Sequence, residues 1–269
     1  MTRGKAATFL MLILATLWAA PVFAATFGTN ITISDGVYTG TGWHSNREDQ
    51  EVEPNCVQTQ MWDLEAFYLN GNKLSLVGGF DFKNGGYDSG RHITYKSGDI
   101  FLDIDSNAKY GPANTGAAGG EGIVKNTFGY DYVIHFTDLA NYKYNVYRID
   151  GTADVQTVYF DQNKTSNPWI WKAGGTKLFD TDQSFAYYSG MANNDANFNG
   201  TVLYGGNHNA LSIDLGFLNG ATFLAHFTEE CGNDTIVGTG TPVPEPGTMA
   251  LLGAGLIGLA GWGRKKFTP

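Results

Sequence analysis

Acidic and amide side chains gather in a short stretch before the middle of the chain. The candidate ligands are Asp99, Asp103, Asp105 and Asn107. Their oxygens suit Ca²⁺, and residues 103–107 have the spacing with which an EF-hand loop begins. The pattern then breaks, because Ala108 stands where a glycine should turn the loop and Asn114 where a bidentate glutamate is required. We predict a calcium site at a strand end, and the alternative is a solvated acidic surface.

Two tryptophans, Trp169 and Trp171, lie two positions apart in the stretch NPWIWKAGG. In a strand they would share one face. If exposed, the two indoles would form a platform for the apolar faces of sugar rings. Trp43, beside His44 in a polar stretch, is a second candidate ligand-binding residue. The alternative for the pair is a place in the core.

Local motifs of enzyme active sites are missing from the sequence. It has no G-x-S-x-G, H-E-x-x-H or C-x-x-C, and none of its five histidines is paired at metal spacing. Glu51 and Glu53 could share a strand face, whereas the adjacent Glu229 and Glu230 would point to opposite faces. Two carboxylates alone are a weak signal for glycoside hydrolysis. We predict a non-catalytic protein, and a secreted glycan-active hydrolase is the alternative.

The elements that must position these residues are short strands, because apolar and polar residues alternate with a period of two. The predicted shared faces are Ile100, Leu102 and Ile104; Tyr130, Tyr132, Ile134 and Phe136; and Phe223, Ala225, Phe227 and Cys231. Asn70-Gly71-Asn72 is a strong hairpin signal between two further strands. The sequence predicts an all-β, antiparallel, jelly-roll-like β-sandwich as a single domain over residues 25–237.

The N-terminus has the three parts of a secretory signal peptide. Arg3 and Lys5 precede an uncharged apolar stretch, and Val22 and Ala24 are the small residues before a cleavage point. The sequence therefore predicts that residues 1–24 are removed and that the chain leaves the cytoplasm.

Cys56 and Cys231 are the two cysteines of the chain. An even count in an exported chain predicts a disulfide. The bridge would close a loop of about 175 residues, and it would stabilise the fold by about 2–5 kcal/mol. The alternative is a reactive thiol, for which the neighbouring sequence offers no activating group.

The C-terminus combines a Pro/Gly linker, residues 238–247, with an apolar stretch and a basic end, residues 248–269. The uncharged residues 248–263 would span about 24 Å as a helix. A bilayer core is about 30 Å thick, so this helix is short for a lasting membrane span. The cations after it lie where the positive-inside rule places cytoplasmic charge.

This C-terminus resembles the PEP-CTERM sorting signal in three ordered parts: a Pro-Glu-Pro motif, a short apolar helix and a cluster of cations. The matching residues are Val243, Pro244, Glu245, Pro246, Arg264, Lys265 and Lys266. The resemblance implies a substrate of exosortase, an integral-membrane, transpeptidase-like enzyme of Gram-negative bacteria that make exopolysaccharide or biofilm matrix. It implies transient anchoring in the inner membrane, processing near the motif, and a final place at the cell surface or outside the cell.

The body of the chain resembles, over residues 62–149, the β-sandwich modules related to family 9 carbohydrate-binding and DOMON-like domains. The resemblance rests on the order of WDLEAFYLNGNKLSLVGGFDF, GDIFLDID and YDYVIHF. It implies a sandwich fold, and no sugar-binding residues carry over from it.

The net charge of the body excludes some classes of binding partner. Residues 25–246 hold 12 Lys and Arg against all 26 Asp and Glu, a net charge of −14. Such a body repels nucleic acid and anionic lipid. The sequence therefore predicts an exported, exosortase-processed surface or matrix protein, with extracellular polysaccharide as its candidate ligand and no nucleic-acid partner.

Overall fold

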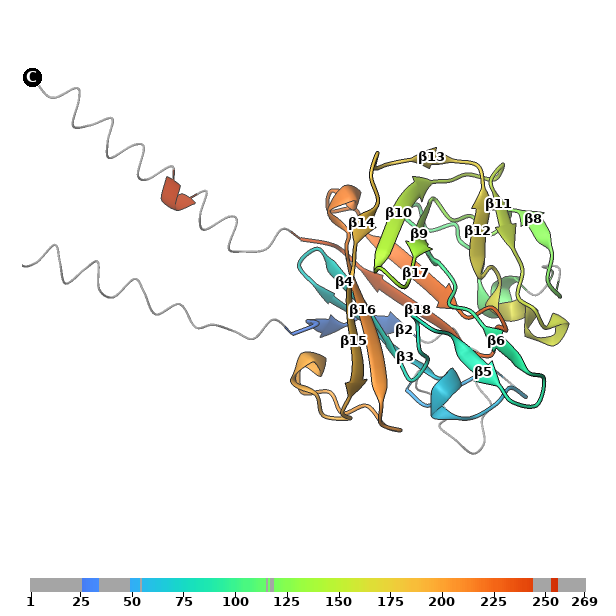
Figure 1. The fold of residues 1–269 in the computed structure, drawn as a ribbon. Coiled ribbons are helices and arrows are strands. Elements are labelled where there is room, and N and C mark those ends of the chain that lie inside the picture. Colours follow the sequence, from blue (N-terminus) through green and yellow to red (C-terminus); the bar gives the residue numbers. More distant parts are fainter. Residues whose placement is uncertain are drawn as a thin grey trace, which may run out of the picture.

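The computed structural model describes residues 26–33, 49–53, 55–114, 116, 119–243 and 253–255. Two antiparallel sheets face each other across a shared core, as Figure 1 shows, so the fold is the all-β sandwich that the alternation predicts. The signal peptide, Trp43, Pro244–Pro246 and the cations 264–266 lie outside the described residues. In the part of the chain that the structure describes, no helix is long and apolar enough to cross a membrane.

Within the described residues, one sheet has five strands in the order β1-β3-β4-β16-β15. These are β1 (Thr29–Asn30), β3 (Leu64–Asn70), β4 (Lys73–Gly78), β16 (His208–Asp214) and β15 (Ala186–Met191). The predicted hairpin joins β3 to β4, since Asn70 pairs with Lys73 across a two-residue turn. Gly71 takes a φ of 59° in that turn, a conformation that glycine adopts without steric cost.

The opposing sheet has the order β13-β10-β9-β7-β17-β18-β2, with β14 also paired to β10. Its strands are β2 (Thr32–Ile33), β7 (Ile100–Asp103), β9 (Tyr132–Asp138), β10 (Lys143–Arg148), β13 (Thr176–Lys177), β14 (Gln183–Ser184), β17 (Phe223–Thr228) and β18 (Thr235–Gly240). The face predicted for residues 223–231 is confirmed, because Phe223, Ala225, Phe227 and Cys231 all enter the shared core.

Two smaller sheets complete the fold. They are β12-β11-β8, formed by β8 (Ile123–Lys125), β11 (Asp154–Gln156) and β12 (Ile170–Ala173), and the pair β5 (Gly86–Asp88) and β6 (Ile93–Tyr95). The short 3₁₀ helices are η1 (Gln60–Trp62), η2 (Gly111–Asn114), η3 (Asp161–Ser166), η4 (Ala196–Phe198) and η5 (Gly216–Leu218).

Two strand faces differ from the prediction, and both differences arise around β7. Ile100 and Leu102 enter the shared core, but Ile104 lies beyond the end of β7 and is exposed. Tyr130 lies before β9 begins and packs with Phe101 in a second cluster that includes residues of β11. β7 is therefore buried on both faces rather than half-solvated.

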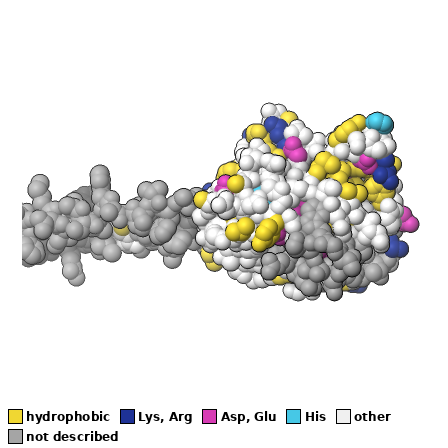
Figure 2. All heavy atoms as spheres, turned by 90° about the horizontal axis from the view of Figure 1, so that it is seen from below, with side chains coloured by type: hydrophobic (Ala, Val, Ile, Leu, Met, Phe, Trp, Pro, Cys, Tyr) yellow, Lys and Arg dark blue, Asp and Glu magenta, His cyan; other side chains and the backbone are white. Residues whose placement is uncertain are grey.

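The surface seen from below in Figure 2 carries small groups of hydrophobic, basic and acidic side chains between uncharged ones. The shared core beneath combines both large sheets: Leu76 and Leu211 come from the five-stranded sheet, and Ile134 and Ile236 from the opposing one. Several polar side chains are buried as deeply as the core residues, and the candidate sites lie among them.

Candidate functional site

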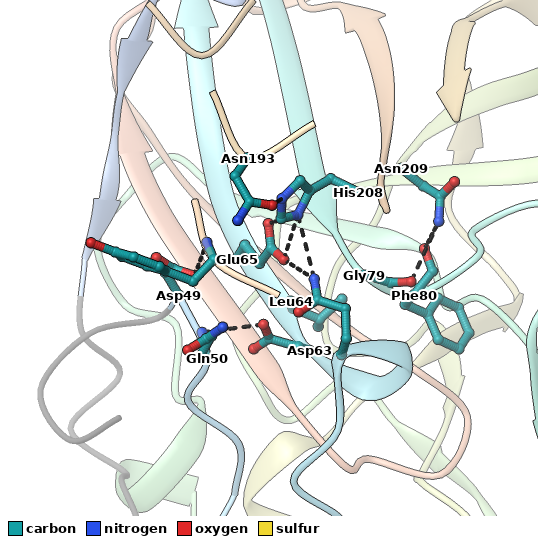
Figure 3. A network of polar contacts seen from close by, with 12 residues as sticks. Asp49, Gln50, Asp63, Leu64, Glu65, Gly79, Phe80, Asn193, His208 and Asn209 are labelled. Carbon is teal, nitrogen blue, oxygen red and sulfur yellow. Dashed lines mark hydrogen bonds and ion pairs between the residues drawn. The ribbon is translucent and has the colours of Figure 1, made fainter. Parts of the chain in front are cut away.

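Three carboxylates converge beside the start of β3. Asp49, Asp63 and Glu65 each offer an oxygen atom that lies within 4.8 Å of the other two. We call them the interior carboxylate group. Asp63 and Glu65 are 0% and 1% exposed, and Asp49 is half-buried. Asp63 ends the 3₁₀ helix η1, and Glu65 lies where the register of β3 against β4 shifts, at a bulge. A bulge re-aims a side chain, and here the side chain is directed into the network drawn in Figure 3.

Glu65 is held by two side chains. His208, the first residue of β16, donates from Nδ1 to Glu65 Oε1 over 2.7 Å, and Gln60 donates from Nε2 to the same oxygen. The other nitrogen of His208, Nε2, lies 3.2 Å from Asn193 Oδ1. These contacts join β3, η1 and β16 into one polar network (Figure 3).

Two glycines make room for Gln60. A Cβ on Gly79 would lie 1.8 Å from the Gln60 carbonyl oxygen, and one on Gly205 would lie 1.3 Å from Oε1 of its side chain. Gly205 also takes a φ of 91°, which other residues rarely adopt. The close fit of these loops fixes Gln60 and, through it, the orientation of Glu65.

Burial dominates the electrostatics of the interior group. Desolvation raises the pKa of Asp63 well above its usual range, and the charges of Glu65 and Asp49 raise it further. Desolvation likewise raises the pKa of Glu65, against the opposing hydrogen bond from Gln60. The pKa of His208 is lowered, chiefly by desolvation, so its ring is neutral at neutral pH and contributes no cation. Burial therefore disfavours the charged forms of both Asp63 and Glu65.

Further buried acids extend this region. Asp234 accepts from the backbone N–H of Leu64 at 2.6 Å, and its own N–H donates to Glu229 Oε2 at 3.2 Å. Burial raises the pKa of Glu229 to about 8. Glu51 and Glu53 are buried nearby, and Glu51 adds to the charge that raises the pKa of Asp234. The sequence gives one signal of this arrangement, namely the acids Asp63 and Glu65 on either side of Leu64, where a largely apolar strand begins.

The predicted calcium ligands lie elsewhere and are only partly brought together. Asp103 and Asp105 meet Asp131 within 4.8 Å, and we call these three the loop carboxylate group. Asn107 touches it by donating its amide N–H to Asp105. Asp99 is not part of it: its carboxylate accepts from His135 Nδ1 and from the backbone N–H groups of residues 136 and 171. Including Asp99 in one ligand set was wrong, because Asp99 instead joins three neighbouring strands.

The predicted tryptophan platform is not formed. Trp169 is 3% exposed and precedes the first residue of β12, so the alternation of that strand does not place it beside Trp171. Trp171 is half-buried, and it stacks on Tyr147 with ring centroids 4.1 Å apart. His135 packs edge-on against Trp171 at 5.1 Å. Desolvation opposes protonation of His135, but the adjacent Asp99 carboxylate outweighs it and raises the pKa of His135.

A pocket of about 340 Å³ lies over Trp169. Its lining combines Lys83, Asn84, Lys96, Ser97, Asp99, Phe136, Leu139 and Trp169. Trp169 Nε1 and Ser97 Oγ are buried there without a hydrogen-bond partner. A buried polar atom without a partner is costly, and both atoms are closed to solvent in this structure.

The predicted disulfide is absent, and both cysteines are free thiols. The side chain of Asn163 separates them: Cys56 donates from Sγ to Asn163 Oδ1 over 3.2 Å, and Asn163 Nδ2 donates to the Cys231 carbonyl over 3.0 Å. Burial raises the pKa of Cys56 to about 12, aided by the charges of Glu53 and Glu229. Neither thiol is therefore activated as a nucleophile.

Residues 242–265 match the model of the PEP-CTERM protein-sorting motif. The motif implies that the chain is exported, is anchored transiently in a membrane, and is presented to exosortase on its way to the cell surface. No curated protein matches the chain, and no solved structure matches it either. The sorting segment is thus recognised from its sequence, whereas a function for the rest of the chain must be argued from the arrangement of its own side chains.

Proposed function

We propose that the protein is a non-catalytic component of the cell surface or extracellular matrix of a Gram-negative bacterium, which binds extracellular polysaccharide after exosortase processing. The sorting motif at residues 242–265 carries the first part of this proposal. Cleavage near the motif would free the sandwich from the inner membrane. The pocket over Trp169 supports the second part.

The pocket has the mixed lining that a sugar ring requires. Phe136 and Trp169 offer apolar surface for C–H groups, while the exposed Asn84 offers an amide for hydrogen bonds. Ser97 Oγ and the Trp169 indole N–H lie unpartnered in the same lining residues and would bind a ligand only if they became exposed. Lys83 and Lys96 add two cations to the lining, although the body as a whole is strongly acidic. This contrast favours a polysaccharide that carries carboxylates.

The same lining argues against the hydrolase alternative. Glycosidases flank the scissile bond with two carboxyl groups. Asp99 is the one acid among the residues that line the described pocket. Its carboxylate already accepts three hydrogen bonds, one from His135 and two from backbone N–H groups. Binding without cleavage is the function that this geometry supports best.

Intact mass measurement of the protein from its host tests the sorting step. We expect a mature species that has lost residues after the Pro-Glu-Pro motif. A mature species that still ends at Pro269 would contradict processing.

Retention on exopolysaccharide tests the pocket. We expect Lys83→Ala and Lys96→Ala to reduce retention on a uronic-acid polymer in affinity electrophoresis, with little change in retention on neutral dextran. Trp169→Phe keeps a ring in place but removes the buried N–H, so it should weaken binding at an unchanged melting temperature. Lys109→Ala, an equal loss of charge at an exposed position outside the pocket, is the matched control. Release of reducing ends by the wild type would favour the hydrolase instead.

A further inference from the structure

Asp63 and Glu65 bring two acids into the interior without an ion pair to a lysine or arginine among the described residues. The side chain that lies against Glu65 is His208, whose Nδ1 is 2.7 Å from Oε2. Buried charges in proteins are paired, coordinate a metal ion, or are neutralised by protonation.

Unpartnered atoms provide a second and independent observation. Asp63 Oδ1 and Glu65 Oε2 are buried and accept no hydrogen bond, although His208 Nδ1 lies 2.7 Å from Oε2, as it does from Oε1. The carbonyl oxygen of the Gln60 side chain is likewise buried without a donor. Leaving such acceptors unsatisfied costs free energy, so two unpartnered carboxylate oxygens in one acidic group indicate a missing positive ligand.

We propose that Asp49, Asp63 and Glu65 bind a divalent cation, Ca²⁺ in preference to Mg²⁺. Carboxylate and amide oxygens are the ligands of hard cations, and Ca²⁺ takes them at about 2.3–2.6 Å. Oxygens within 4.8 Å of one another can therefore all reach one ion placed between them. Asp49 is half-buried and gives the ion a route from solvent, while Asp63 and Glu65 form the buried base.

The surrounding residues keep this site open. Gln60 holds Glu65 through Oε1, and His208 Nδ1 lies 2.7 Å from both carboxylate oxygens. Oε2 accepts no hydrogen bond and remains for the ion. The backbone N–H of Gln50 donates to Asp63 Oδ2 at 3.2 Å, which leaves Oδ1. Each buried carboxylate is thus fixed by one oxygen and unpartnered at the other, as expected for a ligand that is oriented before the ion arrives.

The test is calcium binding by the full-length chain. Protein stripped with EDTA and dialysed against CaCl₂ should hold about one Ca²⁺ per chain by elemental analysis. Its melting temperature should rise by about 5–10 °C at a calcium concentration about 100-fold above the Kd. Mg²⁺ at the same concentration should shift it less.

Two matched variants identify the site. Asp63→Asn should bind no Ca²⁺, yet in EDTA it should melt above the wild type because one like charge has gone; Glu65→Gln provides the same test if the first variant does not fold. Asp105→Asn, an equal change in the loop carboxylate group, should bind as the wild type does. The proposal is overturned if EDTA and CaCl₂ give the wild type the same melting temperature, or if Asp105→Asn abolishes binding and Asp63→Asn does not.

Discussion

The two carboxylate groups of this sandwich contain the same kinds of side chain in opposite surroundings. In the loop group, Asp103 Oδ1 accepts from the N–H groups of Asp105 and Ser106, and Oδ2 accepts from that of Ala108. In the interior group, Asp63 and Glu65 each keep one buried oxygen without a donor. Backbone N–H groups of the loop donate to both oxygens of Asp103, whereas Asp63 and Glu65 each lack a donor at one oxygen.

This difference distinguishes two ways in which acids can cluster in one fold. Acids spaced two apart at a strand end can fold the following loop around themselves, and their oxygens are then occupied by amides. Asp63 and Glu65 are also two positions apart, but they flank the first residue of β3 rather than open a loop, and each keeps one buried oxygen without a donor. Removal of a carboxylate should therefore lower the free energy of unfolding in the loop group and raise it in the interior group.

The largest effect is expected at Asp103. Asp103→Ala removes the acceptor of three backbone N–H groups at a nearly buried position. We expect a loss of about 2–4 kcal/mol of unfolding free energy, because each stranded donor costs about 1–3 kcal/mol and water satisfies part of the loss. Urea denaturation measures it.

Asp105→Ala is the control within the same group. Asp105 is exposed, and the amide of Asn107 donates to its carboxylate. Its loss should cost less than about 0.5 kcal/mol. Equal costs at positions 103 and 105 would contradict the distinction between a buried acceptor and an exposed one.

Sequence reasoning succeeded where local patterns decide the structure. The Asn-Gly signal predicted the β3–β4 hairpin, and the alternation over residues 223–231 predicted a core-facing row, because turn chemistry and period two are local properties. The sorting motif was recognised for the same reason, since its parts are consecutive.

Sequence reasoning failed where contacts between distant segments determine the structure. The period-two alternation predicts that the face of Phe101 is exposed to solvent, because no local pattern shows that residues near β11 cover it. Glu65 and His208 are 143 positions apart, and a bulge that alternation cannot show directs Glu65 inward. The cysteine count suggested a bridge, but only the fold places Asn163 between the two thiols.

A second prediction extends the comparison to Glu229, whose charge reaches Asp63 and Asp234. Its pKa is raised from 4.5 to about 8, so between these values the folded chain binds more protons than the unfolded one. Stability should therefore fall as pH rises through this window, by up to about 1.4 kcal/mol per pH unit, and level off above it. Glu229→Gln should flatten the slope and stabilise the protein at pH 8.5 by about 1–2 kcal/mol.

Glu230→Gln is the matched control for this titration. Glu230 lies on the outer side, partly exposed, and accepts from the backbone N–H of Lys96 at 2.8 Å. Burial also raises the pKa of Glu230, but less than that of Glu229. Chemical denaturation from pH 5 to pH 9, in EDTA so that bound cations do not interfere, should therefore show a slope closer to the wild type for Glu230→Gln than for Glu229→Gln. A slope that survives in Glu229→Gln would place the titrating group elsewhere in the buried acids.

The smallest effect uses Cys56 as a probe of the same interior charge. After desolvation, the charges of Glu53 and Glu229 are the largest causes of its raised pKa. Because the thiolate is the reactive form, removing the charge of Glu229 should lower the pKa of Cys56 and speed its alkylation at pH 8.5 several-fold. Asp131→Asn, which removes a charge from the loop group instead, should leave the rate unchanged. Peptide mapping after iodoacetamide treatment separates Cys56 from Cys231, which is more deeply buried. Equal rates in wild type and Glu229→Gln would mean that burial alone protects the thiol, and that Glu229 is already protonated and neutral at that pH.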